Sequence, residues 1–196
     1  GMSMPFIIAG IITLIAVFIT ALYLPETNKH MEEVQHGKLF DFSKMWHMLF
    51  DPKVGILFVI SLVFFLAFSC AVIYGFQPFT MNVLKITESQ NAAIFTMFGI
   101  VGLITQNLIV GRVTKALGLQ HSFKLGIAFT AVAFFIMFIS RSIPLFIFAS
   151  IILALFNSIV QTLLPTILSR EADSKSQGMI MGLNSSYQSI GMIFGP

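Results

Sequence analysis

The chain has 196 residues, of which 57% are hydrophobic and only 10% are charged. A soluble domain carries about 25% charged residues, so this chain has too few charges to cover the surface of a soluble helical protein. Its net charge of +3 comes from bases scattered over short segments, which do not form the basic face that nucleic-acid binding requires. Composition therefore predicts a polytopic membrane protein with the lipid bilayer, and no nucleic acid, as a partner.

Six stretches are long and apolar enough to cross the hydrocarbon core, which takes about 20 residues of helix. None of them alternates polar and apolar residues as a strand of a membrane barrel would. We therefore expect an all-α fold with six transmembrane helices. The first lies within residues 1–25, and the other five occupy about 54–76, 91–110, 122–140, 144–164 and 179–196.

The longest connection runs over residues 26–53, and it contains a short amphipathic pattern. Phe42, Met45, Trp46 and Leu49 recur there at helical spacing. Such a helix either lies in the membrane interface or packs on a neighbouring domain as a linker helix. The sequence does not choose between these two interpretations.

The distribution of lysine and arginine predicts the orientation in the membrane. If residues 26–53 face the cytoplasm, alternation of the spans places residues 111–122 and 165–178 there too. Of the 11 lysines and arginines, only Lys85 and Arg141 then lie outside. This is a strong positive-inside bias, so we expect all three segments to be cytoplasmic.

The segment GRVTKALG, from Gly111 to Gly118, resembles the cytoplasmic loop motif of the major facilitator superfamily in its glycine spacing. Arg112 lies inside this frame, and Lys115 stands where the family usually has an acid. In such a loop the small residues let the turn fit between helix ends. The cations meet helix C-termini or lipid phosphates.

Three further segments carry the same resemblance. LPET, from Leu24, resembles the end of the family's sixth helix and the start of its central cytoplasmic linker, and the stretch from Phe68 resembles its seventh and eighth helices. The segment SREADSKSQGMIMGLNSSYQSIGMIFGP, from Ser169, resembles the tenth-to-eleventh loop and eleventh helix of the drug:proton antiporter branch. The resemblance implies most of the C-terminal bundle of a major facilitator fold. The resemblance covers helices six to eleven of the family's twelve. By this comparison the sequence stops before the last helix and does not include the N-terminal half. On this basis residues 1–25 are the sixth helix, 26–53 the central linker and 54–196 the C-terminal bundle.

The resemblance implies a secondary active transporter that moves a small apolar or amphipathic compound, as in drug or metabolite efflux, by alternating access. The expected partners are this substrate, the missing N-terminal half and protons as coupling ion, in the inner membrane of a bacterium. All histidines lie in or near loops and no ionisable residue lies deep in a span, so we expect no enzyme, no catalytic residue, no cofactor and no metal. Since proton relays need an ionisable group within the membrane, a coupling carboxylate would lie in the missing half.

Polar positions inside apolar spans indicate a substrate path. Asn157 and Gln161 are four residues apart and share a helix face, and by resemblance the seventh and tenth helices face the central cavity. The substrate-binding candidates are Tyr74, Gln77, Asn157, Gln161, Asn184 and Gln188. Buried amides also link helices by hydrogen bonds. For Asn157 and Gln161 both roles stay open, whereas for Gln106 and Asn107, near a helix end, linking is favoured.

Small residues predict close helix packing. The candidates are Gly178, Gly182, Gly191, Gly195 and Pro196. The fourth span, 122–140, has almost no polar residue, and we expect it to face lipid.

The alternative is a self-contained six-helix membrane protein that oligomerises as a channel or scaffold. The abrupt end of the chain at Gly195-Pro196 argues against it. An intramembrane enzyme would need a nucleophile and a base at one depth, and no base lies deep in any of the spans.

Overall fold

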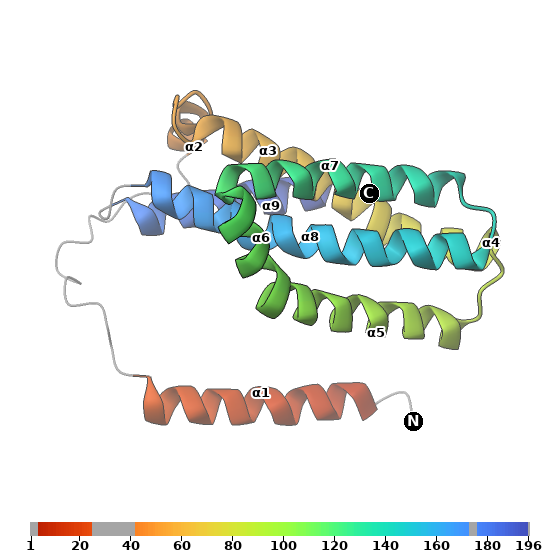
Figure 1. Cartoon of the computed structure of the whole chain (residues 1–196). Coiled ribbons are helices and arrows are strands. Elements are labelled where there is room, and N and C mark those ends of the chain that lie inside the picture. Colours follow the sequence, from red (N-terminus) through yellow and green to blue (C-terminus); the bar gives the residue numbers. More distant parts are fainter. Residues whose placement is uncertain (1–3, 25–41, 173–175, 196) are drawn as a thin grey trace. The chain divides into compact units, whose positions relative to one another are not determined.

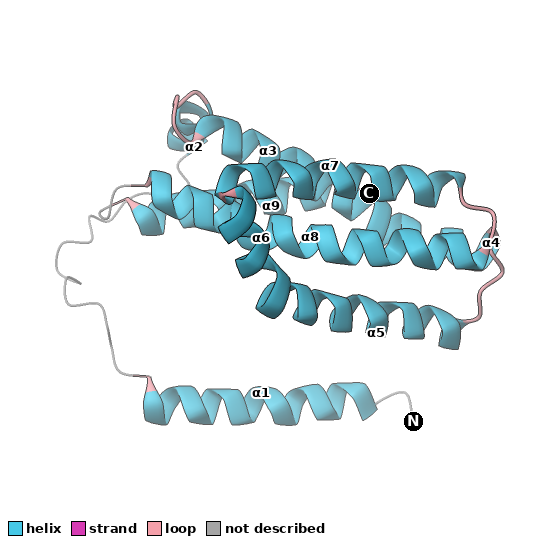
Figure 2. Cartoon of the chain, in the orientation of Figure 1, coloured by secondary structure: helices cyan, strands magenta, loops and turns pink. Residues whose placement is uncertain are grey.

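The computed structural model describes residues 4–24, 42–172 and 176–195. Every regular element in these residues is a helix, joined by short turns (Figure 2). The predicted all-α fold is therefore confirmed. Contacts divide the chain into two units, residues 1–41 and 42–196, and each is described by itself.

The described part of the first unit is the helix α1 (Met4–Tyr23). Its segment Phe6–Tyr23 is long and apolar enough to cross a membrane, and none of it is buried in the structure. A helix that is apolar on every face is stable only where hydrocarbon or other protein surrounds it.

The second unit contains the remaining helices, drawn in Figure 1. They are α2 (Phe42–Leu49), α3 (Gly55–Phe68), α4 (Phe76–Asn82), α5 (Glu88–Ile104), α6 (Val110–Leu117), α7 (Leu119–Ile139), α8 (Ile143–Glu171) and α9 (Gln177–Phe194). The π-helical segment Ser69–Gly75 joins α3 to α4, and a second one, Thr105–Ile109, joins α5 to α6. Each of these pairs is consequently one continuous helix, 55–82 and 88–117.

Five helices in the described residues are long and apolar enough to span a membrane. They are α1, α3 with α4, α5 with α6, α7 and α8. The sixth expected span, 179–196, forms α9 but is not among them. Its middle carries Asn184, Ser185, Tyr187 and Gln188, which lower its apolar character.

Three of the expected helix boundaries were wrong. The span predicted to end at 76 continues to Asn82. The span predicted to end at 164 continues through Pro165 to Glu171. All of the GRVTKALG segment except Gly118 lies in the helix α6 and not in a loop, and Arg112 and Lys115 are exposed on the surface of this helix. The chain turns at Gly118 alone, with φ +80° and ψ 160°, a conformation open essentially to glycine only.

The helix α8 is the centre of the second unit. α7 packs along one side of it and α5 along another, while α9 packs along α3 (Figure 1). Buried apolar residues form two clusters, one around Phe58 and Leu164 and the other around Phe76 and Phe146. The Phe76 and Phe146 ring centroids are 5.2 Å apart. In a membrane such contacts stabilise the fold through van der Waals packing, because lipid is as apolar as the side chains.

The helix α7 has two different faces. At Gly126 an added Cβ would lie 2.8 Å from Cγ2 of Val160, so α7 and α8 approach closely. On the opposite face Phe135 and Phe138 are 65% and 76% exposed. The expectation of a lipid-facing fourth span therefore fits the outer face alone.

Close packing at two of the predicted glycines joins α9 to α3 and the π-helical segment after it. An added Cβ at Gly191 would lie 2.6 Å from the carbonyl oxygen of Leu62. One at Gly195 would lie 2.5 Å from Cβ of Ser69. Backbone and backbone therefore meet along this contact, as in small-residue helix interfaces generally.

The other packing candidates behave differently. An added Cβ at Gly178 or Gly182 would meet no atom of the described residues within 4 Å. These two glycines do not mediate packing in this part of the chain, because their faces of α9 turn away from α3. Pro196 lies outside the described residues.

The amphipathic helix α2 packs against α3. Met48 and Leu49 contact the apolar cluster around Phe58. Trp46, which the predicted apolar stripe included, is instead 64% exposed. The rest of the linker, and the side chains of Phe42 and Met45, lie outside the part that is described.

Candidate substrate groove

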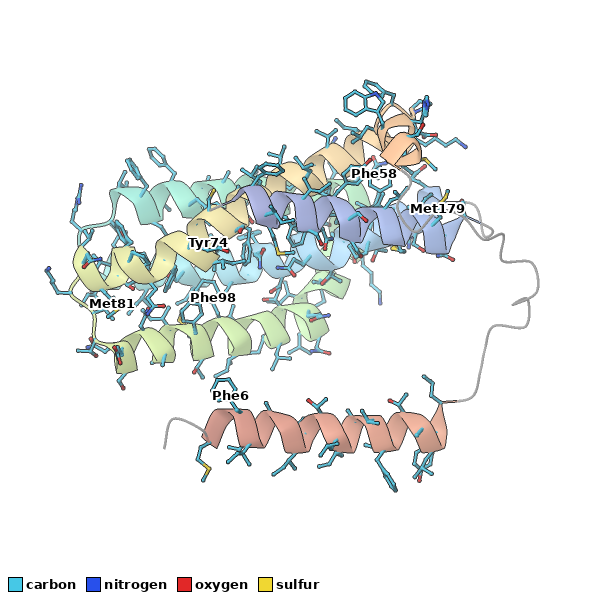
Figure 3. All side chains as sticks on the ribbon, turned by 180° about the vertical axis from the view of Figure 1, so that it is seen from behind. Phe6, Phe58, Tyr74, Met81, Phe98 and Met179 are labelled. Carbon is cyan, nitrogen blue, oxygen red and sulfur yellow. The ribbon has the colours of Figure 1, made fainter. Side chains whose placement is uncertain are left out.

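A groove of about 690 Å³ lies between α5 and α8. Phe98, labelled in Figure 3, lies at its α5 side. Its polar lining consists of Gln106, Asn157, Ser158, Gln161 and Thr162. We call it the amide groove. None of the described residues that line it is charged.

Glycines on α5 leave space in this groove, and a proline on α8 leaves a helix carbonyl without its usual N–H donor. On α5 the lining residues Gly99 and Gly102 have no side chain, and an added Cβ at Gly99 would meet nothing within 4 Å. On α8 the lining residue Pro165 lies inside the helix. Proline has no N–H to donate to the carbonyl of the residue four positions earlier, which is Gln161. That carbonyl can accept a hydrogen bond from another molecule.

The side chains of α8 present both donors and acceptors to the groove. Nε2 of Gln161 donates to Oδ1 of Asn157 at 3.3 Å, which leaves the Asn157 amide nitrogen and the Gln161 amide oxygen for other partners. The hydroxyls of Ser158 and Thr162 each donate to a carbonyl of their own helix at 2.8 Å, so they can still accept. The groove can therefore bind hydrogen-bond donors and hydrogen-bond acceptors of a ligand through uncharged side chains.

Gln106, for which the sequence analysis favours a helix-linking role, becomes a substrate-binding candidate in the structure. It lines the amide groove, whereas the neighbouring Asn107 donates to the carbonyl of Leu103 at 2.8 Å and is not part of the lining. Gln106 lies seven and four residues after Gly99 and Gly102, a spacing that puts all three on one helix face. This spacing is the signal that could have identified it.

Three other predicted candidates do not reach the amide groove. Tyr74, labelled in Figure 3, is 51% exposed on the π-helical segment after α3, and Gln77 is exposed on α4. Gln188 is half-buried on α9. None of the three is in the lining.

Asn184 links helices. It is only 4% exposed, and its Oδ1 accepts a hydrogen bond from Oγ of Ser61 at 2.9 Å. This contact joins α9 to α3 in the same interface as Gly191. The structure thus brings together only Asn157 and Gln161 of the six candidates.

The described residues contain no group of three or more histidine, cysteine, aspartate or glutamate side chains that could hold a metal ion. Over residues 1–196 the chain matches the sequence model of the Major Facilitator Superfamily. The chain belongs to this superfamily. The resemblance inferred from the motifs is confirmed, and with it a multi-pass integral membrane protein.

Three curated proteins resemble the chain over 98–100% of its length. It is 30% identical over 200 residues to multidrug resistance protein 2 of Bacillus subtilis (strain 168), covering 100% of this chain and 49% of that protein. It is 28% identical to multidrug resistance protein 1 of the same organism, covering 98% of this chain and 48% of that protein. It is 21% identical to solute carrier family 22 member 18 of Mus musculus, covering 100% of this chain and 50% of that protein. The chain thus spans about half the length of these relatives. No solved structure matches it.

Proposed function

We propose that the chain is the C-terminal half of a secondary transporter that exports a small apolar or amphipathic compound by alternating access. The amide groove forms one wall of the substrate path. In such transporters the substrate site lies near the middle of the membrane, between two bundles that rock against each other. The partner of this chain is then an N-terminal half whose bundle faces α5 and α8.

The observation that carries the proposal is the groove's chemistry. It offers amide and hydroxyl groups and the backbone carbonyl of Gln161, which receives no N–H from Pro165, with no charge among its described lining. A charged solute entering it would lose its hydration without gaining an ion pair, which is costly. A compound with a large apolar surface and a few polar groups loses far less. Two relatives that are named multidrug resistance proteins support this substrate class.

Charge placement supports the orientation in the membrane. Arg112, Lys115, Lys124 and Arg170 lie near the ends of α6, α7 and α8. We therefore place residues 26–53, 111–122 and 165–178 in the cytoplasm of a bacterial cell, with the chain in its inner membrane. The coupling ion in this proposal is the proton, and the carboxylate that carries it lies in the N-terminal half.

The test is transport by the full-length protein in liposomes, with a fluorescent amphipathic dye and an imposed proton gradient. The variant Asn157→Ala/Gln161→Ala should reduce the apparent affinity for the dye about tenfold, since each lost hydrogen bond contributes about 0.5–1.5 kcal/mol. Asn107→Ala, an amide outside the groove, serves as the matched control.

Equal losses in the double variant and the control would contradict the assignment of the groove. A dye flux that neither saturates nor responds to the proton gradient would contradict the transporter mechanism and favour an oligomeric channel instead.

A further inference from the structure

A second groove, of about 320 Å³, lies where the beginnings of α3 and α7 meet the end of α8. It shares no lining residue with the amide groove. Its polar residues are Lys53, Gln120, Lys124 and Glu171. We call it the lysine groove.

The lysine groove has an apolar and a charged part. Its apolar walls consist of Ile56, Leu57, Ile60, Phe123, Ile127 and Ile167. The charged part holds two ammonium groups against a single carboxylate, that of Glu171. The net charge of the groove's lining is therefore positive. Both lysines are exposed, and their long side chains can keep the charge in the headgroup region while the stem lies along apolar surface.

One wall of the lysine groove opens toward hydrocarbon. Ile56, in the first turn of α3, is 62% exposed, and the helix that it begins is long and apolar enough to cross the membrane. An exposed isoleucine in such a helix contacts lipid chains. The occupant must therefore combine an apolar chain with an anionic group near Lys53 and Lys124.

We infer that the lysine groove binds an anionic phospholipid of the cytoplasmic leaflet, with its phosphate at Lys53 and Lys124 and one acyl chain along Ile56 and Ile60. Basic pockets between membrane helices on the cytoplasmic side are suited to such headgroups. The groove's volume is at the small end of the range for ligand pockets, about 300–1,000 Å³, which suits part of one chain while the rest stays in the bilayer. A lipid held there contacts α3, α7 and α8 at once.

The inference uses the orientation given under the proposed function but not the substrate path. Its failure would leave the assignment of the amide groove untouched, because the two grooves share no residue and the two experiments have different readouts.

The experiment is native mass spectrometry of the full-length protein in detergent, titrated with phosphatidylglycerol or with phosphatidylcholine. Phosphatidylglycerol should bind more tightly. Lys53→Gln/Lys124→Gln should weaken it by about fivefold for each lysine removed, the factor that about 1 kcal/mol per cation near an anionic surface gives. The matched control is Lys85→Gln/Arg141→Gln, which removes two exposed cations outside the groove and should change binding by less than about twofold.

A second variant tests the apolar part. Ile56→Trp fills the groove from its exposed side, leaves both lysines in place and does not enter the core. It should displace phosphatidylglycerol. Unchanged binding in this variant, an equal loss in the Lys85/Arg141 control, or displacement of the lipid by inorganic phosphate alone would overturn the inference.

Discussion

The α3–α9 contact and the amide groove between α5 and α8 are built from similar residues and have different consequences. In the α3–α9 contact, Gly191 lets the two backbones meet, and Asn184 is buried with Ser61 as its partner. In the amide groove, an added Cβ at Gly99 would meet open space, and Asn157 bonds to Gln161 of its own helix.

The difference lies in what occupies the space beside the glycine. Where the backbone of another helix fills that space, the neighbouring amide is enclosed and its hydrogen bond holds two helices together. Where nothing fills it, the amides face an opening and keep donors and acceptors for a ligand. The same residue types therefore stabilise the fold in one place and can bind a substrate in the other.

The largest expected effect comes from closing the space at Gly191. Gly191→Ala places a methyl group against backbone atoms of α3 that cannot move aside, and overpacking of this kind costs about 1–3 kcal/mol. We expect a lower unfolding temperature of the full-length protein in detergent.

Gly182→Ala is the control on the same helix, because its Cβ meets no described atom within 4 Å. It should be neutral or stabilising, since alanine favours a helix by about 0.5–1 kcal/mol over glycine. If both variants lost the same stability, the close α3–α9 contact would be wrong.

A smaller effect should separate the two kinds of amide. Asn184→Ala removes an interhelical hydrogen bond within the membrane, which contributes about 0.6 kcal/mol on average and at most about 1.7. We expect it to lower stability and to leave the apparent affinity for the dye unchanged. Asn157→Ala should do the reverse. Thermal unfolding and transport kinetics of both variants check these two expectations. If Asn184→Ala and Asn157→Ala changed stability and dye affinity to the same extent, the two amides would not have different roles.

The smallest effect concerns two adjacent amides. Gln106→Ala removes one hydrogen-bonding group from the amide groove and should weaken apparent dye affinity by about threefold, at the low end of the range for a single hydrogen bond. Asn107→Ala should not change it, because that side chain bonds to its own helix. Initial rates over a range of dye concentrations provide the comparison. A stronger effect of Asn107→Ala would show that the substrate contacts the other face of this helix, so the assignment of the groove would be wrong.

Much of the fold could be predicted because a helix that crosses the hydrocarbon core must be long and uncharged. Five of the expected spans follow from that requirement alone. Helix ends could not be located as well. The fifth span is predicted to end at 164, but α8 continues through Pro165, as a helix in a membrane bundle can when neighbouring groups satisfy the freed backbone. Gly118 ends α6 through its backbone conformation, which no periodicity displays.

The site was predictable only in part. Asn157 and Gln161 share a face by their spacing, but Asn184 and Gln188 have the same spacing and do not line the groove. What distinguishes the two pairs is the neighbouring helix, which is a property of the tertiary structure. Gln106 shares a helix face with Gly99 and Gly102 by its spacing, but the sequence does not show that this face borders an open space beside α8.

The most direct test of the account is the accessibility of single cysteines in a cysteine-free version of the full-length protein. Gln161→Cys and Asn184→Cys would be treated with a water-soluble, membrane-impermeant maleimide, with and without the dye. The account predicts that the cysteine at 161 reacts and that the dye protects it, while the cysteine at 184 stays unreactive. Labelling at 184 but not at 161, or labelling at 161 that the dye does not slow, would contradict it.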